Sequence, residues 1–185
     1  MRHNNNATLT LAALLSLAPL VSAGDVITPA EEAAIRRSHM EEQVRKKLVR
    51  LPYYGAFDHL AFQTDGEKVR LEGKVHTPWL KDDAVRAALS VEGVESVDNQ
   101  IEVLPLSGHD DGLRRALYRA IYGDQSLQVL AIRPNHPIRI LVENGHVTLE
   151  GVVDNEAQKN IAGLKANGVP GTFSVVNNLR VPERS

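Results

Sequence analysis

The chain of 185 residues carries a formal net charge of −2, is 43% hydrophobic and contains no cysteine. A slightly negative chain without a basic stripe lacks the phosphate-neutralising charge on which nucleic-acid binding depends, so nucleic acid is not expected as a partner. The lack of cysteine excludes disulfides, thiolate metal sites and thiol nucleophiles. The composition that remains suits soluble globular domains, one large or two small.

The first residues have the layout of a secretory signal peptide. Arg2 gives a short positive segment, residues 7–20 form an apolar run, and residues 21–23 resemble a cleavage site. The apolar run is shorter than the roughly 20 residues that a membrane span needs. We therefore predict a signal peptide over 1–23, a periplasmic protein and no transmembrane span after signal removal.

Two helix-starting patterns follow the predicted signal peptide. A capping box at Thr28 and Glu31 predicts a short helix in an N-terminal extension, residues 24–37. A second capping box at Ser38 predicts an amphipathic helix that Pro52 ends. Its apolar residues recur at helical spacing: Met40, Val44, Leu48 and Leu51.

This second helix also carries a basic face, made of Arg45, Lys46, Lys47 and Arg50. Such side chains suit acidic lipid headgroups, near which each cation contributes about 1 kcal/mol. They equally suit an ordinary solvated face, and the neighbouring Glu41 and Glu42 favour that interpretation.

The next part of the chain is expected to form three strands and one helix. An alternating strand, 60–64, leads through a turn at Gly66 to a second strand, 69–75. A helix that begins near Thr77 precedes a third strand, 94–103. Because the last connection passes through a helix, the second and third strands should run parallel within a mixed sheet.

Strand 69–75 returns later in the chain as 147–153. The same displacement along the sequence relates further pairs: Gly93 with Gly171, Val97 with Val175, Asn99 with Asn177, Ile101 with Leu179, and Val103 with Val181. The repeat indicates one supersecondary unit used twice. Gly73 and Gly151 fall on the apolar side of the repeated strands, where we expect a covering helix to approach the backbone closely.

The second unit shows the same order of elements. Asp110 or Asp111 is expected to cap its first helix, an Asn144-Gly145 turn joins its hairpin strands, and strand 173–181 ends it. The first helix should turn Leu113, Leu117 and Ile121 inward and Arg114, Arg115 and Arg119 outward. The last helix, capped by Asp154, should turn Ala157, Ile161 and Leu164 inward.

The two units differ most between the first helix and the hairpin. The stretch from Leu51 to Val69 is shorter than the equivalent stretch from Ile121 to Val147, and the difference indicates an insertion of eight in the second unit. The insertion contains the apolar residues Leu127, Val129, Leu130 and Ile132, followed by Arg133. Apolar residues in a long loop mark either an extra element that seals the core, which we favour, or an adhesive surface.

No arrangement of residues typical of catalysis or metal binding is found in the sequence. The histidines lack metal-ligand spacing, the acidic pairs lie near predicted helix starts, and no serine lies in a GxSxG motif. Asn99 and Asn177 share the inward parity of their strands, where pinning a turn is favoured over contacting a ligand. Trp79 suits the core, an interdomain contact or a membrane-interface anchor, in that order. We predict no enzyme activity and no catalytic, cofactor or metal site.

The pattern resembles the BON family, the bacterial osmotically inducible and nodulation domain. The residues that carry the resemblance are Asp65-Gly66 with strand 69–75, the segment 93–99 and helix 38–51, and in the second copy Asn144-Gly145, 147–153 and 175–179. The resemblance implies an α+β fold of two tandem α-β-β-α-β domains, 38–104 and 110–182, joined by a linker at 105–109. Each domain would hold a three-stranded mixed sheet covered by two helices.

The resemblance also implies a periplasmic role in envelope maintenance, with attachment to phospholipid membranes. Our first hypothesis is a non-enzymatic binding module that associates with anionic phospholipid surfaces and supports the envelope under osmotic or envelope stress. The alternative is an adaptor that binds another envelope protein through the second-domain insertion and an exposed sheet edge. Candidate lipid- or partner-binding residues are Arg114, Arg115, Arg119, Leu127, Leu130, Ile132 and Arg133.

Overall fold

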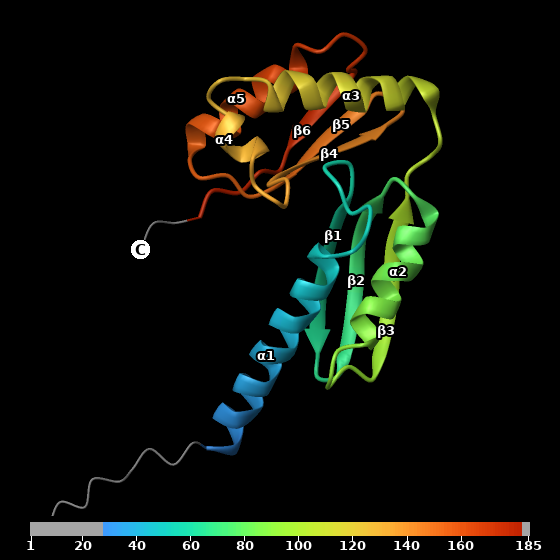
Figure 1. The fold of residues 1–185 in the computed structure, drawn as a ribbon, viewed down its shortest axis with the longest axis vertical. Helices are drawn as coiled ribbons and strands as arrows, with labels where there is room; N and C mark the ends of the chain where they lie inside the picture. The colour runs from blue at the N-terminus through green and yellow to red at the C-terminus, as the bar shows by residue number, and fades with distance from the viewer. Residues whose placement is uncertain (1–27, 183–185) are drawn as a thin grey trace, which may run out of the picture.

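The computed structural model describes residues 28–182, so the predicted signal peptide lies outside the described residues. Two three-stranded sheets, each covered by helices, lie one after the other along the molecule (Figure 1). The elements of the first domain are α1 (Pro29–Val49), β1 (His59–Asp65), β2 (Lys68–Val75), α2 (Pro78–Leu89) and β3 (Ser96–Val103). Those of the second are α3 (Gly108–Tyr122), α4 (Gln128–Ala131), β4 (Ile138–Glu143), β5 (His146–Gly151), α5 (Glu156–Asn167) and β6 (Ser174–Asn177). The predicted fold class is confirmed.

Both sheets are mixed and have the same register. In the first, β1 is antiparallel to β2 and β2 is parallel to β3, with Leu71 opposite both Phe62 and Asn99. In the second, Leu149 holds the equivalent place, opposite Ile140 and Asn177. All three positions follow the displacement that relates the two repeated strands, so the sequence repeat is also a repeat of strand pairing.

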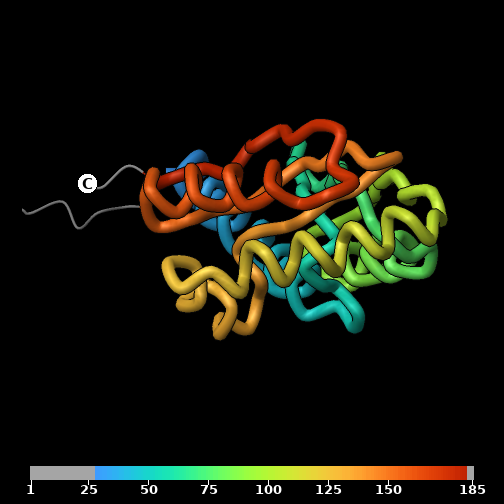
Figure 2. The backbone as a smooth tube through the Cα atoms, turned by 90° about the horizontal axis from the view of Figure 1, so that it is seen from above, coloured from blue at the N-terminus to red at the C-terminus, as the bar shows by residue number. Residues whose placement is uncertain are grey.

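Each domain has its own hydrophobic core between its sheet and its two main helices. In the first domain, α1 and α2 contribute buried Met40, Val44, Leu48, Leu80, Ala84 and Ala88, which pack on Val69, Leu71, Val75 and Ile101 of the sheet. In the second, α3 and α5 lie side by side over the sheet (Figure 2). Their buried residues include Leu113, Leu117, Ile121, Ala162 and Ala166.

The N-terminal helix differs from the prediction. The capping box at Thr28 and Glu31 is present, but α1 continues without interruption to Val49. Ser38 therefore lies inside a helix and does not cap one. Residues 28–39 are exposed, and this part of α1 projects past the first sheet (Figure 1).

The last helix is rotated relative to the prediction. Its N-cap is Asn155 and not Asp154, and Asn155 accepts a hydrogen bond from the backbone N–H of Gln158. Leu164, expected inside, is 72% exposed. The helix turns small residues inward because β6 lies close to it: a Cβ on Gly163 would be 2.8 Å from the side-chain nitrogen of Asn177.

The repeated strand glycine makes room for a neighbouring strand and not for a helix. Gly73 has a φ of +128°, and a Cβ there would lie 2.1 Å from the carbonyl oxygen of His59. Gly151 has a φ of +125° and stands in the same relation to Pro137, at 2.0 Å. The packing role is as predicted, but the partner is the backbone at the start of the antiparallel strand.

The loop between α1 and β1 joins the two domains. Ala56, 5% exposed, belongs to the core of the second domain and not of the first. Beside it, the guanidinium of Arg139 donates to the carbonyl oxygen of Gly55 at 2.6 Å and lies 4.2 Å from the centre of the Tyr54 ring. The two domains therefore share packing as well as polar contacts.

Candidate functional site

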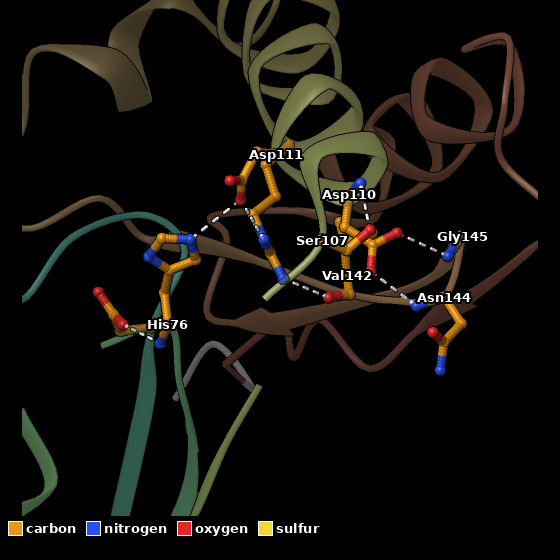
Figure 3. Close-up of polar contacts among 9 residues, drawn as sticks. His76, Ser107, Asp110, Asp111, Val142, Asn144 and Gly145 are labelled. Atoms are coloured by element: carbon orange, nitrogen blue, oxygen red, sulfur yellow. Dashed lines mark hydrogen bonds and ion pairs between the residues drawn. The ribbon is translucent and has the colours of Figure 1, made fainter. Parts of the chain in front are cut away.

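A series of polar contacts crosses the domain junction (Figure 3). His76, directly after β2, places Nε2 3.0 Å from Oδ1 of Asp111 at the start of α3. The same Asp111 oxygen accepts a hydrogen bond from Arg114 at 2.6 Å. The hydrogen bond from His76, and then that from Arg114, lower the pKa of Asp111. The backbone N–H of His76 is itself held by Asp58 at 2.7 Å, so both ends of the contact are fixed.

An ion pair also crosses the same junction. Lys74 donates to Oε2 of Glu143 at 2.7 Å and lies 3.3 Å from Glu102 of its own domain. The hydrogen bond to Glu143 is the main cause that raises the pKa of Lys74. Because the pair is partly exposed, it orients the domains more than it stabilises them.

The predicted cap of α3 is wrong, for a reason visible in Figure 3. The N-cap is Ser107, whose hydroxyl accepts from the backbone N–H of Asp110. The fully buried Asp110 carboxylate accepts instead from the backbone N–H groups of Asn144 and Gly145, at 2.8 and 2.9 Å. Asp110 therefore pins the hairpin turn of the second domain to the start of α3.

Arg114, expected on the outer face of α3, is buried with 1% exposure. Its guanidinium donates to the carbonyl oxygen of Val142 on β4 at 2.6 Å. Arg114 precedes Leu117 by three residues, which places it on the flank of the inward stripe and beside the sheet edge. It therefore has a structural role and is not available to a lipid or partner.

The other candidate residues of the second domain separate into two groups. Arg115 and Arg119 are exposed four residues apart, on one face of α3. Ile132 is 82% exposed, and Arg133 bonds Asp154 at 2.7 Å. By contrast, the expectation of an adhesive surface fails for Leu127 and Leu130, which are fully buried because α4 seals the core beside α3.

A groove in the first domain contains residues outside the predicted candidate set. It lies between α1 and α2, has a volume of about 320 Å³, and is lined by Gln43, Lys46, Lys47, Arg50, Leu51, Ala87 and Ser90. Lys46 pairs with Glu42 at 3.5 Å, whereas no ion pair within residues 28–182 involves Lys47 or Arg50. The basic residues from Arg45 to Arg50 were the sequence signal for this site. The sequence did not indicate that α2 forms the second wall of the groove.

Two large apolar side chains are exposed on α2. Trp79 is 55% exposed and Leu89 is 47% exposed. The core position favoured for Trp79 is therefore wrong, because Leu80 takes the inward place at the start of this helix. Exposed apolar side chains on a helix that also borders a cationic groove suit the boundary between lipid headgroups and acyl chains.

The repeated asparagines have a structural role, but they bond along the outer strands of the sheets and do not pin a turn as the sequence favoured. The side-chain oxygen of Asn99 accepts from the backbone N–H of Ile101 at 3.1 Å, and that of Asn177 accepts from Leu179 at 3.3 Å. Asn177 also donates to the carbonyl oxygen of Lys159 on α5. Each amide oxygen thus accepts from a backbone N–H of the outer strand of its sheet, so that N–H is not free to pair with a further strand at that edge.

Within residues 28–182, no three acidic or histidine side chains converge as a metal site would require. Over the same residues, no helix is both long and apolar enough to cross a membrane.

Two tandem α-β-β-α-β domains joined through a shared loop define this chain as a two-domain α+β protein. The BON domain profile matches residues 37–105 and 109–183, which together are more than half of the chain. The chain therefore belongs to the BON domain family, with two copies of the domain.

A relative of known name is the osmotically-inducible protein Y of Escherichia coli (strain K12), 32% identical over 124 residues. The match covers 65% of this chain and 61% of that protein, so the chain spans about three fifths of the relative's length. Among solved structures, the C-terminal domain of CdsD, a structural protein of the type III secretion system of Chlamydia trachomatis, is 12% identical. It covers 77% of this chain and 96% of its own, with a TM-score of 0.27, a likeness too low to define a shared fold.

Proposed function

We propose that the protein is a non-enzymatic periplasmic module that binds anionic phospholipid surfaces and supports the integrity of the cell envelope. The observation that carries this proposal is the groove between α1 and α2, where Lys47 and Arg50 have no ion-pair partner within residues 28–182. A phosphate headgroup would supply the missing charge, and each cation near an anionic surface contributes about 1 kcal/mol. Trp79 and Leu89 would enter the interface beside it.

Membership of the BON family and the name of the Escherichia coli relative support a role in osmotic stress. The exported location follows from the predicted signal peptide over 1–23. A peripheral mode of attachment follows from the lack of cysteine, which leaves no thiol for a lipid anchor.

Cosedimentation of the chain from residue 24 with phosphatidylglycerol vesicles tests the proposal, with phosphatidylcholine vesicles as reference. We expect the K47E/R50E variant to bind at least about tenfold more weakly, and we expect binding to weaken as salt is added. The matched control is R115E/R119E on α3, which changes the net charge equally. Loss of binding in R115E/R119E but not in K47E/R50E would place the lipid site on α3. If the parent chain binds neither kind of vesicle at low salt, the proposal is overturned.

A second candidate function is an adaptor that docks an envelope protein on the insertion of the second domain. It is favoured by Val129 and Ile132, which are 50% and 82% exposed although Leu127 and Leu130 beside them are fully buried. The V129S/I132S variant should lose crosslinks to its partner in envelope extracts while keeping its vesicle binding. Unchanged crosslinks would remove this candidate.

A further inference from the structure

The outer edge of β4 is closed by other parts of the chain. Ile138, Ile140 and Val142 direct their backbone groups away from β5, because the other residues of this strand form the hydrogen-bonded pairs of the hairpin. The hydroxyl of Tyr122 accepts from the N–H of Ile138 and donates to its carbonyl oxygen. Ala56 accepts from Ile140 at 2.7 Å, and Arg114 donates to Val142.

The equivalent edge in the first domain is β1, where Leu60, Phe62 and Thr64 occupy the places of Ile138, Ile140 and Val142. Leu60 donates from its N–H to the Tyr54 hydroxyl at 3.4 Å, a long hydrogen bond. Within residues 28–182, no group outside the sheet accepts from the N–H of Phe62. The position that Ala56 fills on β4 is therefore open on β1.

The helices explain this difference. The inward residues Met40, Val44 and Leu48 of α1 correspond to Leu113, Leu117 and Ile121 of α3. In this alignment Glu41 takes the place of Arg114, and Arg45 takes the place of Tyr118. Glu41 bonds the side chain of Thr64 and not a backbone carbonyl, so the edge of β1 keeps the backbone groups of Phe62 free for pairing.

A groove of about 600 Å³ runs along this edge. It is lined by six consecutive residues of β1, His59 to Thr64, which shows that it follows the strand edge and not one face of the sheet. Its walls are Glu41 and Arg45 of α1 and, from the second domain, Glu150, Gly151, Asn178 and Arg180. The cationic groove of Lys46, Lys47 and Arg50 lies on the opposite flank of α1.

The charged groups of the β1 groove that lack a hydrogen-bond partner within residues 28–182 are guanidinium donors, although each domain contributes one carboxylate as well as one cation to the lining. The carboxylate of Glu41 accepts from Thr64, and that of Glu150 accepts from Asn178 at 2.7 Å, so neutral donors of this chain already hold both. Arg45 makes one exposed contact with Glu42, at 3.6 Å. Arg180 makes no ion pair within residues 28–182. A ligand that enters from solvent therefore meets a cation from each domain.

We propose that the edge of β1 binds an extended, acidic segment of a partner protein as an additional strand. The N–H of Phe62 donates to a backbone carbonyl of that segment, as Ile140 donates to Ala56 within this chain. Carboxylates of the segment pair with Arg45 and Arg180. Backbone pairing supplies affinity for any extended chain, and the two arginines select for acidic ones.

The probe is a capped nonapeptide of alternating threonine and glutamate, titrated into the ¹⁵N-labelled chain from residue 24. We expect amide shifts confined to β1 and the groove walls, and slower hydrogen exchange at Phe62. The matched peptide of threonine and lysine should bind at least about tenfold more weakly, since exposed ion pairs contribute up to about 1 kcal/mol each. The R45E/R180E variant should bind the acidic peptide more weakly by the same factor. The R36E variant, on the exposed part of α1, should bind it with the affinity of the parent.

Three results would overturn the proposal. The first is absence of binding by either peptide, and the second is binding with shifts that map outside β1. The third is concentration-dependent protection of Phe62 in the chain alone, which would assign the edge to a second copy of the protein. Vesicle binding by R45E/R180E, tested in parallel, shows whether this site is separate from the cationic groove.

Discussion

The backbone N–H of Ile140 donates to the carbonyl oxygen of Ala56 at 2.7 Å, which makes a residue of the first domain part of an edge strand of the second. Ala56 is also buried in the second core. We predict that Ala56→Glu lowers the free energy of unfolding by about 3 kcal/mol or more, because it places an unpaired charge in that core. Urea unfolding followed by circular dichroism measures the effect. Tyr53→Asn, at an 81% exposed position in the same loop with a positive φ, should change little.

Arg114 and Arg115 are adjacent in sequence but should respond oppositely to replacement. Arg114→Met removes the donor to Val142 and should cost about 2 to 3 kcal/mol of unfolding free energy, because a buried carbonyl loses its partner. Arg115→Met changes an exposed side chain and should stay within about 0.5 kcal/mol of the parent. Equal costs in the two variants would contradict the structural role of Arg114.

The glycines of the repeated strands should not tolerate a side chain. Gly73→Ala and Gly151→Ala each place a Cβ about 2 Å from a carbonyl oxygen at positive φ, and we expect losses of about 3 kcal/mol or more. Gly112→Ala is the control, since a Cβ there meets nothing within 4 Å. Because alanine favours the helical state over glycine, this control should be more stable by about 0.5 to 1 kcal/mol. Thermal unfolding of the three variants provides the comparison.

Stability should fall as the solution is acidified below neutral pH, in part through His136. Burial, and then the charge of Arg139, lower the pKa of His136 below 6.5. The unfolded chain then takes up the proton at a higher pH than the folded chain. The contribution of His136 to the free energy of unfolding is therefore fully present above about pH 6.5 and is lost as the pH falls toward the folded-state pKa. Burial lowers the pKa of His59 in the same direction.

The His136→Gln variant tests this contribution. It should lose less unfolding free energy than the parent between about pH 7.5 and about pH 5, because its amide does not titrate in that range. Comparing the two proteins at about pH 8 separates the lost Tyr118 hydrogen bond from the titration. An identical pH dependence in both would exclude a role for His136.

The sequence was sufficient for the fold because its strongest signals are local and repeated. Strand 69–75 and its copy 147–153 alternate regularly, and the turns at Gly66 and Asn144-Gly145 join each of them in a hairpin to the strand before it. The register of Leu71 with Asn99 recurs in the second sheet at the displacement that relates the two copies of the strand. Local periodicity and turn chemistry are therefore enough to predict the fold of each unit, without knowledge of the contacts between the units.

The candidate site was less accessible to sequence reasoning because it depends on contacts between distant segments. The position of Arg114 depends on the carbonyl oxygen of Val142, 28 residues later. The inward face of α5 depends on Asn177, whose amide requires a glycine opposite it. The core positions Leu48 and Ile121 correspond, so the insertion in the second unit is five residues, and not the eight counted from Leu51.

Ala56 also has a consequence for the independence of the second domain. The carbonyl oxygen that bonds Ile140 at the edge of β4, and one side chain of the second core, come from a loop of the first domain. A copy of the second domain made alone would lack both, so its edge strand and its core would be incomplete.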